Sequence, residues 1–286
     1  MVQASAHTII TALKSYASTK KSKDLSRFFK TGKGQYGEGD KFIGIVVPSL
    51  RKVAKKYASS TSLETVDDLL KSPIHEVRLC ALLILVSMYK KADTKGKKKI
   101  FAFYIAHTKM INNWDLVDLT APNIVGDYLL NLQTSSSGLT RGSMTSILPR
   151  HHVLLAPYPT GEPRRLRKPG VLGHSHPELV EGSLSPVLFN FAQSTSLWER
   201  RIAIVSTFAF IRSGRHQETF AAANMLLYDK HDLIHKAVGW MLREVGKRIG
   251  KDTLREFLDK HASTMPRTAL RYAIEHMDKD EREKYM

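Results

Sequence analysis

Residues 199–205 carry the sequence ERRIAIV, and this pattern recurs along the chain. The stretches EVRLCALL (76–83) and HKAVGWML (235–242) resemble it, and TALRYAI (268–274) is a weaker relative. Ala203 lies 34 positions before Ala237, which lies 36 before Ala273, and Ala81 lies 36 positions before Val117. Periods of this size are typical of stacked helix pairs, with a small residue where neighbouring helices approach. The sequence therefore predicts an all-α fold, an α-solenoid whose concave face is built from one helix of each repeat.

The segments around these repeats have helical periodicity, and no pair of alternating strands joined by a hairpin turn is evident. Two short helices are expected within residues 5–30, and Pro48 begins another at the first-turn position that proline favours. The apolar stretch 42–47 is interpreted as a packed lead-in to this helix and not as a strand. Further helices are predicted at 62–70, 73–91, 95–108, 115–132, 184–194, 196–212, 215–228, 231–248, 251–261 and 265–277.

One interval breaks the repeat period. Val117 and Ala203 are 86 positions apart, and the surplus lies at about 134–183, which holds six of the 11 prolines and six of the 17 glycines. This composition disfavours helix. We predict a single domain over residues 1–286, interrupted by a disordered or loosely packed insertion that loop-closure entropy tolerates. The insertion contains pairs of histidines at 151–152 and 174/176, but without nearby cysteine we expect no metal site.

The charge of the chain points to a polyanionic partner. The 286 residues carry 44 Lys and Arg against 27 Asp and Glu, a formal net charge of +17, which favours nucleic acid over an anionic membrane surface. No apolar run approaches the length of a transmembrane helix, and the N-terminus lacks the features of a signal peptide. The sole cysteine, Cys80, lies in an apolar run and suits a reducing compartment. We expect a cytoplasmic monomer without a membrane partner.

A loop with four glycines occupies residues 31–40, TGKGQYGEGD. It resembles a phosphate cradle, but it has neither the spacing of a dinucleotide motif nor the lysine–serine ending of a nucleotide-binding loop. A flexible or DNA-facing loop is the interpretation that the sequence favours.

Each of the three tryptophans has a charged residue on the same helical face. Trp114 precedes Asp118 by four positions, and Trp198 and Trp240 precede Arg201 and Arg243 by three. Aromatic rings could contact a sugar or base, arginines could bind phosphate, and an acid beside an aromatic face could hold a cation. The alternative is that the tryptophans are core residues and Asp118 is an ordinary solvated acid.

Four stretches together resemble the AlkD-like family of bacterial DNA alkylation repair enzymes, which are alkylpurine DNA glycosylases built from HEAT-like repeats. They are KFIGIVVPSLR (41–51), NWDLVD (113–118), LWERRIAI (197–204) and KAVGWMLRE (236–244). The resemblance covers essentially everything except the insertion. It implies a basic, concave DNA-binding face, with no cofactor.

The resemblance also assigns roles to particular residues. It implies that Asp118 is the catalytic acid, that Trp114 and Trp240 contact the sugar, and that Arg201 and Arg243 bind the DNA backbone. Trp198 is expected to serve in packing. Because the insertion separates Asp118 from Arg201, this site requires the repeats to stack across it.

The expected substrate is double-stranded DNA that contains N3- or N7-alkylated purines. Alkylation makes the purine cationic and a good leaving group, and cleavage leaves positive charge on the deoxyribose, which Asp118 could stabilise while positioning water. We expect a monofunctional hydrolase, because no lysine is singled out as a Schiff-base nucleophile. Two alternatives are a non-catalytic HEAT-repeat protein that binds damaged or unusual DNA, and a protein-binding scaffold, which the net charge disfavours.

Overall fold

The structure is a computed structural model that describes residues 3–136 and 184–286, all of which are helix, turn or loop apart from one isolated bridge between Lys41 and Ile74. The N-terminal part contains α1 (Ala6–Lys14), α2 (Thr19–Phe28), α3 (Val47–Tyr57), α4 (Leu63–Leu70), α5 (His75–Lys91), α6 (Thr94–Ala106), η1 (Thr108–Met110), α7 (Trp114–Asp118), η2 (Pro122–Gly126) and α8 (Asp127–Ser136). The C-terminal part contains α9 (Pro186–Ala192), α10 (Leu197–Ser206), α11 (Phe208–Arg212), α12 (Gln217–Leu226), α13 (Asp232–Arg248), α14 (Lys251–His261), α15 (Arg267–Ala273) and α16 (Lys279–Tyr285). The predicted insertion falls largely outside the described residues.

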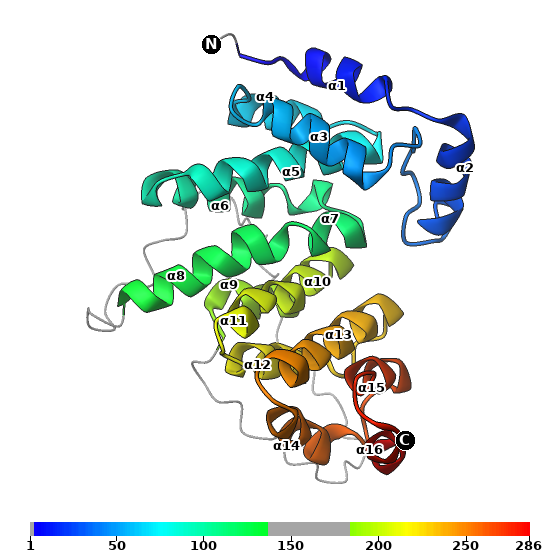
Figure 1. Cartoon of the computed structure of the whole chain (residues 1–286), viewed down its shortest axis with the longest axis vertical. Helices are drawn as coiled ribbons and strands as arrows, with labels where there is room; N and C mark the ends of the chain where they lie inside the picture. Colours follow the sequence, from blue (N-terminus) through cyan, green and yellow to red (C-terminus); the bar gives the residue numbers. More distant parts are fainter. Residues whose placement is uncertain (1–2, 137–183) are drawn as a thin grey trace, which may run out of the picture.

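The helices stack in the order of the sequence to form an α-solenoid, as the repeats predicted (Figure 1). Figure 1 shows α7, α10, α13 and α15 following one another along one side, with α6, α8 and α12 on the other. Contacts run from α5 to α7, from α7 to α10, from α10 to α13 and from α13 to α15. We call α7, α10, α13 and α15 the site row.

Small residues lie where neighbouring helices of the stack approach, which confirms the expectation from the repeat pattern. Ala81, Ala203 and Ala237 are fully buried. A Cβ added to Gly239 of α13 would lie 2.3 Å from the backbone carbonyl oxygen of Ala269 in α15. Any side chain at this glycine would therefore push two helices of the site row apart.

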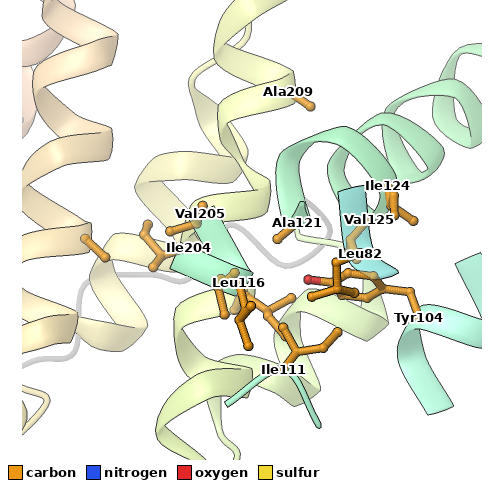
Figure 2. Packing of buried hydrophobic residues seen from close by; sticks show 14 of the residues in the cluster. Leu82, Tyr104, Ile111, Leu116, Ala121, Ile124, Val125, Ile204, Val205 and Ala209 are labelled. Atoms are coloured by element: carbon orange, nitrogen blue, oxygen red, sulfur yellow. The ribbon is translucent and has the colours of Figure 1, made fainter. Parts of the chain in front are cut away.

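Apolar side chains from α5, α7 and α10 form the core beneath the site row (Figure 2). Leu82 of α5, Leu116 of α7 and Ile204 and Val205 of α10 are completely buried. Burying a side chain of this size contributes about 1.5–3 kcal/mol. This packing fixes the position of α7 against α10 and so the relative position of the polar side chains that these two helices carry.

Two helices predicted as continuous are broken in the structure. The prediction of one helix over 115–132 is wrong, because α7 ends at Asp118 and is followed by a turn and a π-helical segment. Pro122 accounts for the break, since its ring would clash with the carbonyl group four residues earlier, that of Asp118. The helix predicted over 196–212 is likewise divided at Thr207, whose hydroxyl donates to the Ile204 carbonyl. Helix α16 was not predicted.

The segment 42–47 is not a strand, in agreement with its interpretation as a lead-in to α3. It is held by Glu76 of α5, whose carboxylate accepts hydrogen bonds from the backbone amides of Ile43, Gly44 and Ile45. Within the described ranges, none of the helices combines the length and apolar character needed to cross a bilayer.

Candidate functional site

Asp118 and Arg201 form a bidentate ion pair between the last residue of α7 and the middle of α10. Arg201 Nε lies 2.9 Å from Asp118 Oδ1, and Arg201 Nη2 lies 2.8 Å from Oδ2. The remaining guanidinium nitrogen of Arg201, Nη1, donates to the carbonyl of Leu233 in α13. The Arg201 side chain is 6% exposed and that of Asp118 is 15% exposed. One arginine thus joins three successive members of the site row.

The electrostatics of Asp118 reflect two opposing effects. Burial raises the pKa of the Asp118 carboxyl above its ordinary value, and the charge and hydrogen bonds of Arg201 lower it without fully offsetting burial. The carboxylate nevertheless keeps unused acceptor capacity, because two oxygens have about four lone-pair positions and Arg201 takes two of them. Arg201 therefore stabilises the ionised form and leaves it able to interact with a second group.

Trp114 begins α7, one turn before Asp118, and belongs to an aromatic cluster with the end of α2. Its ring stacks on Phe29 at a centroid separation of 5.1 Å and an interplanar angle of 10°, and Phe28 meets it edge-on at 5.9 Å. Phe28 is 63% exposed, whereas Phe29 is buried. Asn113 caps α7 by accepting the Trp114 amide proton. The cluster leaves Trp114 partly exposed beside the acid.

A buried polar network lies behind Trp114. His75 Nδ1 is 3.0 Å from Asp40 Oδ2 and its Nε2 is 2.9 Å from Asp115 Oδ2. Arg78 Nη2 donates to Asp40 Oδ1 at 2.6 Å, and Asn113 donates to the same carboxylate. Burial lowers the pKa of His75, but the two carboxylates outweigh it and raise that pKa above its ordinary value. The network fixes the end of the glycine-rich loop against α5 and α7.

Trp240 and Arg243 lie on α13, and Arg243, unlike Arg201, forms no ion pair with Asp118. Leu233, whose carbonyl binds Arg201, and Trp240 are seven residues apart and so share a helical face. Trp240 is partly exposed and packs against Phe208 at 6.2 Å. Arg243 forms ion pairs with Glu275 and Glu244. The structure brings Asp118, Trp114 and Arg201 together and places Trp240 further along the site row.

No group of His, Cys, Asp and Glu side chains in residues 3–136 and 184–286 has the arrangement of a metal site. The histidine pairs at 151–152 and 174/176 lie outside the described residues.

Comparison with known proteins shows which family the chain belongs to. The model of a family described as DNA alkylation repair enzyme matches residues 9–140 and 174–277, which is most of the chain. The chain belongs to the DNA alkylation repair enzyme family. The unmatched residues between the two segments, 141–173, lie inside the stretch predicted to be an insertion.

A solved structure shares the fold of this DNA alkylation repair family member. It is described as a predicted DNA alkylation repair enzyme from Enterococcus faecalis, with a TM-score of 0.59 and 13% sequence identity over 92% of this chain and 97% of that one. At this identity the likeness concerns the fold alone. No match was found among the curated proteins.

Sequence reasoning did not find several residues that lie around the candidate site. These are Tyr36, Phe28, Asp40, His75 and Asp115. Their contacts join positions up to 162 apart, as between Tyr36 and Trp198, which no helical spacing can indicate. The sequence did contain one indication of Tyr36, because this tyrosine lies among four glycines in the loop 31–40, and glycines allow a backbone to pack closely against its neighbours.

Proposed function

We propose that this protein is a monofunctional DNA N-glycosylase that releases cationic N3- or N7-alkylated purines from duplex DNA. Membership of the repair family supports a role in DNA repair. The observation that carries the finer proposal is the Asp118–Arg201 pair beside the exposed part of Trp114. A partly exposed carboxylate with spare acceptor capacity suits the stabilisation of a developing sugar cation.

The proposed chemistry uses the weak glycosidic bond of an alkylated purine nucleotide. An alkylated purine leaves as a neutral base, so that the enzyme has only to stabilise the oxocarbenium ion and position water at C1′. Asp118 supplies the negative charge, and the faces of Trp114 and Trp240 favour the cationic sugar. Arg201 favours the ionised form of the carboxylate. The water attacks C1′ from the side of Asp118 and passes a proton to that carboxylate, which releases it to solvent to complete hydrolysis.

Arg201 and Arg243 are proposed to bind the DNA backbone, with the site row as the DNA-binding face. In the free protein both arginines are paired with carboxylates, so each would have to add or exchange a partner for phosphate. Arg243 is the simpler case because Glu275, its partner, is 54% exposed. The variant Arg243→Ala should weaken binding to all duplexes alike and reduce the slope of log affinity against log salt by about 1.

The decisive test is the release of 7-methylguanine from alkylated duplex DNA, detected by chromatography. Asp118→Asn should lower the single-turnover rate by about 100-fold or more while duplex binding remains. Asp68→Asn, which changes an exposed acid on α4, serves as the matched control and should retain the wild-type rate. Full activity of Asp118→Asn would contradict the proposed role.

Each carboxylate oxygen of Asp118 already accepts a hydrogen bond from Arg201, and this observation favours one second candidate, a non-catalytic protein that recognises damaged DNA. In that case Arg201 would hold Asp118 as a structural pair and nothing would be released. Tight binding of alkylated duplex without any release of base by the wild-type protein would select this candidate.

A further inference from the structure

His75, the first residue of α5, is 1% exposed and bridges two carboxylates from different parts of the chain. Its Nδ1 is 3.0 Å from Asp40 Oδ2, at the end of the glycine-rich loop, and its Nε2 is 2.9 Å from Asp115 Oδ2 in α7. A neutral imidazole has one N–H and can donate to only one of these carboxylates, whereas an imidazolium ion donates to both. The two short contacts are therefore satisfied together only when His75 is protonated.

The two carboxylates that face His75 differ in their other partners. Asp40 has a second cationic partner in Arg78 of α5, whose Nη2 lies 2.6 Å from Asp40 Oδ1. Glu76, the next residue of α5, directs its carboxylate to backbone amides of the segment before α3. Within residues 3–136 and 184–286, His75 is the only cationic side chain that forms an ion pair with Asp115. The charge of Asp115, which is 5% exposed, is therefore offset by the proton on His75.

His75 is linked to Trp114 by two routes. Asp115 follows Trp114 directly in α7, so its hydrogen bond to His75 holds the first turn of that helix. The Phe29 ring contacts both, since it stacks on Trp114 at 5.1 Å and lies 5.0 Å from the His75 ring. Phe42 stacks on His75 at 4.6 Å, and aromatic faces favour a cation beside them. The orientation of Trp114 therefore depends on the position of the His75 ring.

The charge of His75 also affects Asp118, through Asp115. Burial raises the pKa of Asp118 above its ordinary value, Arg201 lowers it, and the charge of Asp115 raises it further. A proton on His75 offsets the charge of Asp115 and so reduces this last effect. Protonated His75 therefore favours the ionised form of Asp118.

We propose that protonated His75 is a positioning residue, which holds Trp114 and Asp118 in the arrangement needed for base release. This inference rests on the proposed glycosylase function. When His75 loses its proton, a bare ring nitrogen faces a carboxylate oxygen and one of the two contacts breaks. Displacing groups around a reacting centre by about 1 Å can lower a rate by about 100-fold. Burial lowers the pKa of His75, but the two carboxylates raise it above its ordinary value, and base release should slow as the pH rises through that pKa.

The experiment measures release of 7-methylguanine from duplex DNA between about pH 6 and pH 9 for the wild type, His75→Gln and His107→Gln. Protein is in saturating excess, so that the rate reports the bound complex, and spontaneous release is subtracted at each pH. His107 is the matched control, because its Nε2 lies 2.8 Å from Asp67 in a histidine–aspartate pair outside the network.

The wild type and His107→Gln should lose about tenfold or more in rate towards alkaline pH. His75→Gln should already be slow at acidic pH and should show no such decline. A decline that persists in His75→Gln, or a wild-type rate that does not decline over this range, overturns the inference. A folding defect alone would lower the rate of His75→Gln without removing its pH dependence, so that outcome also counts against positioning by His75.

A second measurement does not depend on catalysis and separates failure of this inference from failure of the proposed function. Acrylamide quenching of tryptophan fluorescence is recorded over the same pH range, and the difference between each protein and its Trp114→Phe variant gives the contribution of Trp114. In the wild type Trp114 should become more accessible as the pH rises, and in His75→Gln it should be equally accessible throughout. If the wild type releases no base at any pH, the glycosylase proposal fails, but this result would still support positioning by His75. The same quenching profile in the wild type and His75→Gln would overturn it.

Discussion

The buried ion pair between Asp118 and Arg201 makes a quantitative prediction about stability. Both side chains are largely withdrawn from water and joined by two hydrogen bonds of 2.8 and 2.9 Å. Removing one member of such a pair leaves the other charge buried without compensation, which typically costs about 3–5 kcal/mol. We therefore expect Asp118→Ala and Arg201→Met each to destabilise the fold by about that amount.

The double variant should be much less destabilised than the sum of the single variants. Once one charge is gone, removing the other relieves an unpaired buried group, so the coupling energy should be about 2–3 kcal/mol. Arg201→Met also loses the hydrogen bond to the Leu233 carbonyl. The double variant loses the same hydrogen bond, so its contribution cancels in the double-mutant cycle. Because domains have about 5–15 kcal/mol of stability, all three variants should remain measurable.

Urea unfolding followed by far-ultraviolet circular dichroism supplies the four free energies, provided that the slopes of the transitions agree. The pH dependence gives an independent check. With Arg201 replaced, the pKa of Asp118 in the folded state rises further above its unfolded value, so the variant gains stability relative to wild type as the pH falls. Single-variant effects that add within about 0.5 kcal/mol, or a difference that does not depend on pH, would refute this account of the pair.

Three further predictions concern the surroundings of the site. Glu76→Ala removes the carboxylate oxygen, Oε1, that accepts three backbone amide protons, leaves those donors unpaired, and should cost about 1–3 kcal/mol in urea unfolding; a loss below about 0.5 kcal/mol would contradict this. Gly239→Ala should destabilise by about 1–3 kcal/mol in the same assay, because its Cβ meets the backbone of α15, and a stabilised variant would show that α13 and α15 yield easily. The pKa of His75 is raised in the folded state, so its contribution to stability is complete at acidic pH and is lost as the pH rises through that pKa. His75→Gln should remove this part of the pH dependence, which can be measured from urea unfolding midpoints at several pH values. Identical pH profiles for variant and wild type would show that His75 makes no such contribution.

The sequence predicted the solenoid because its determinants are local and periodic. A buried alanine at a spacing of 34 to 36 residues reports directly on helix packing, and the positions of Ala203 and Ala237 in the structure agree with it. The break after Asp118 was missed although Pro122 indicates it, because the apolar periodicity continues through the break. Pro122 was the stronger signal, because a proline has no backbone N–H to donate to the carbonyl four residues earlier, that of Asp118.

The site was only partly predictable from the sequence. Trp114 and Asp118 share a helical face, so their spacing indicated a pair, but the partner of each side chain comes from elsewhere in the chain. Phe29 lies at the end of α2, and Tyr36 lies on the following loop, whose path depends on Gly37 and on the buried network around His75. Such contacts are set by tertiary packing, which the spacing of residues along one helix does not encode.

The contact between α7 and α10 shows how the repeat array accommodates the extra residues that separate these two helices in the sequence. Asp118 and Arg201 are 83 positions apart, yet they meet with bidentate geometry, and the core residues beneath them are fully buried. The entropic cost of closing a loop grows only slowly with its length, by about 0.6 kcal/mol for each doubling. The burial of Leu116 against α10 contributes about 1.5–3 kcal/mol and so can offset such a cost. The register between these repeats is therefore determined by the surfaces that touch and not by the length of chain that connects them.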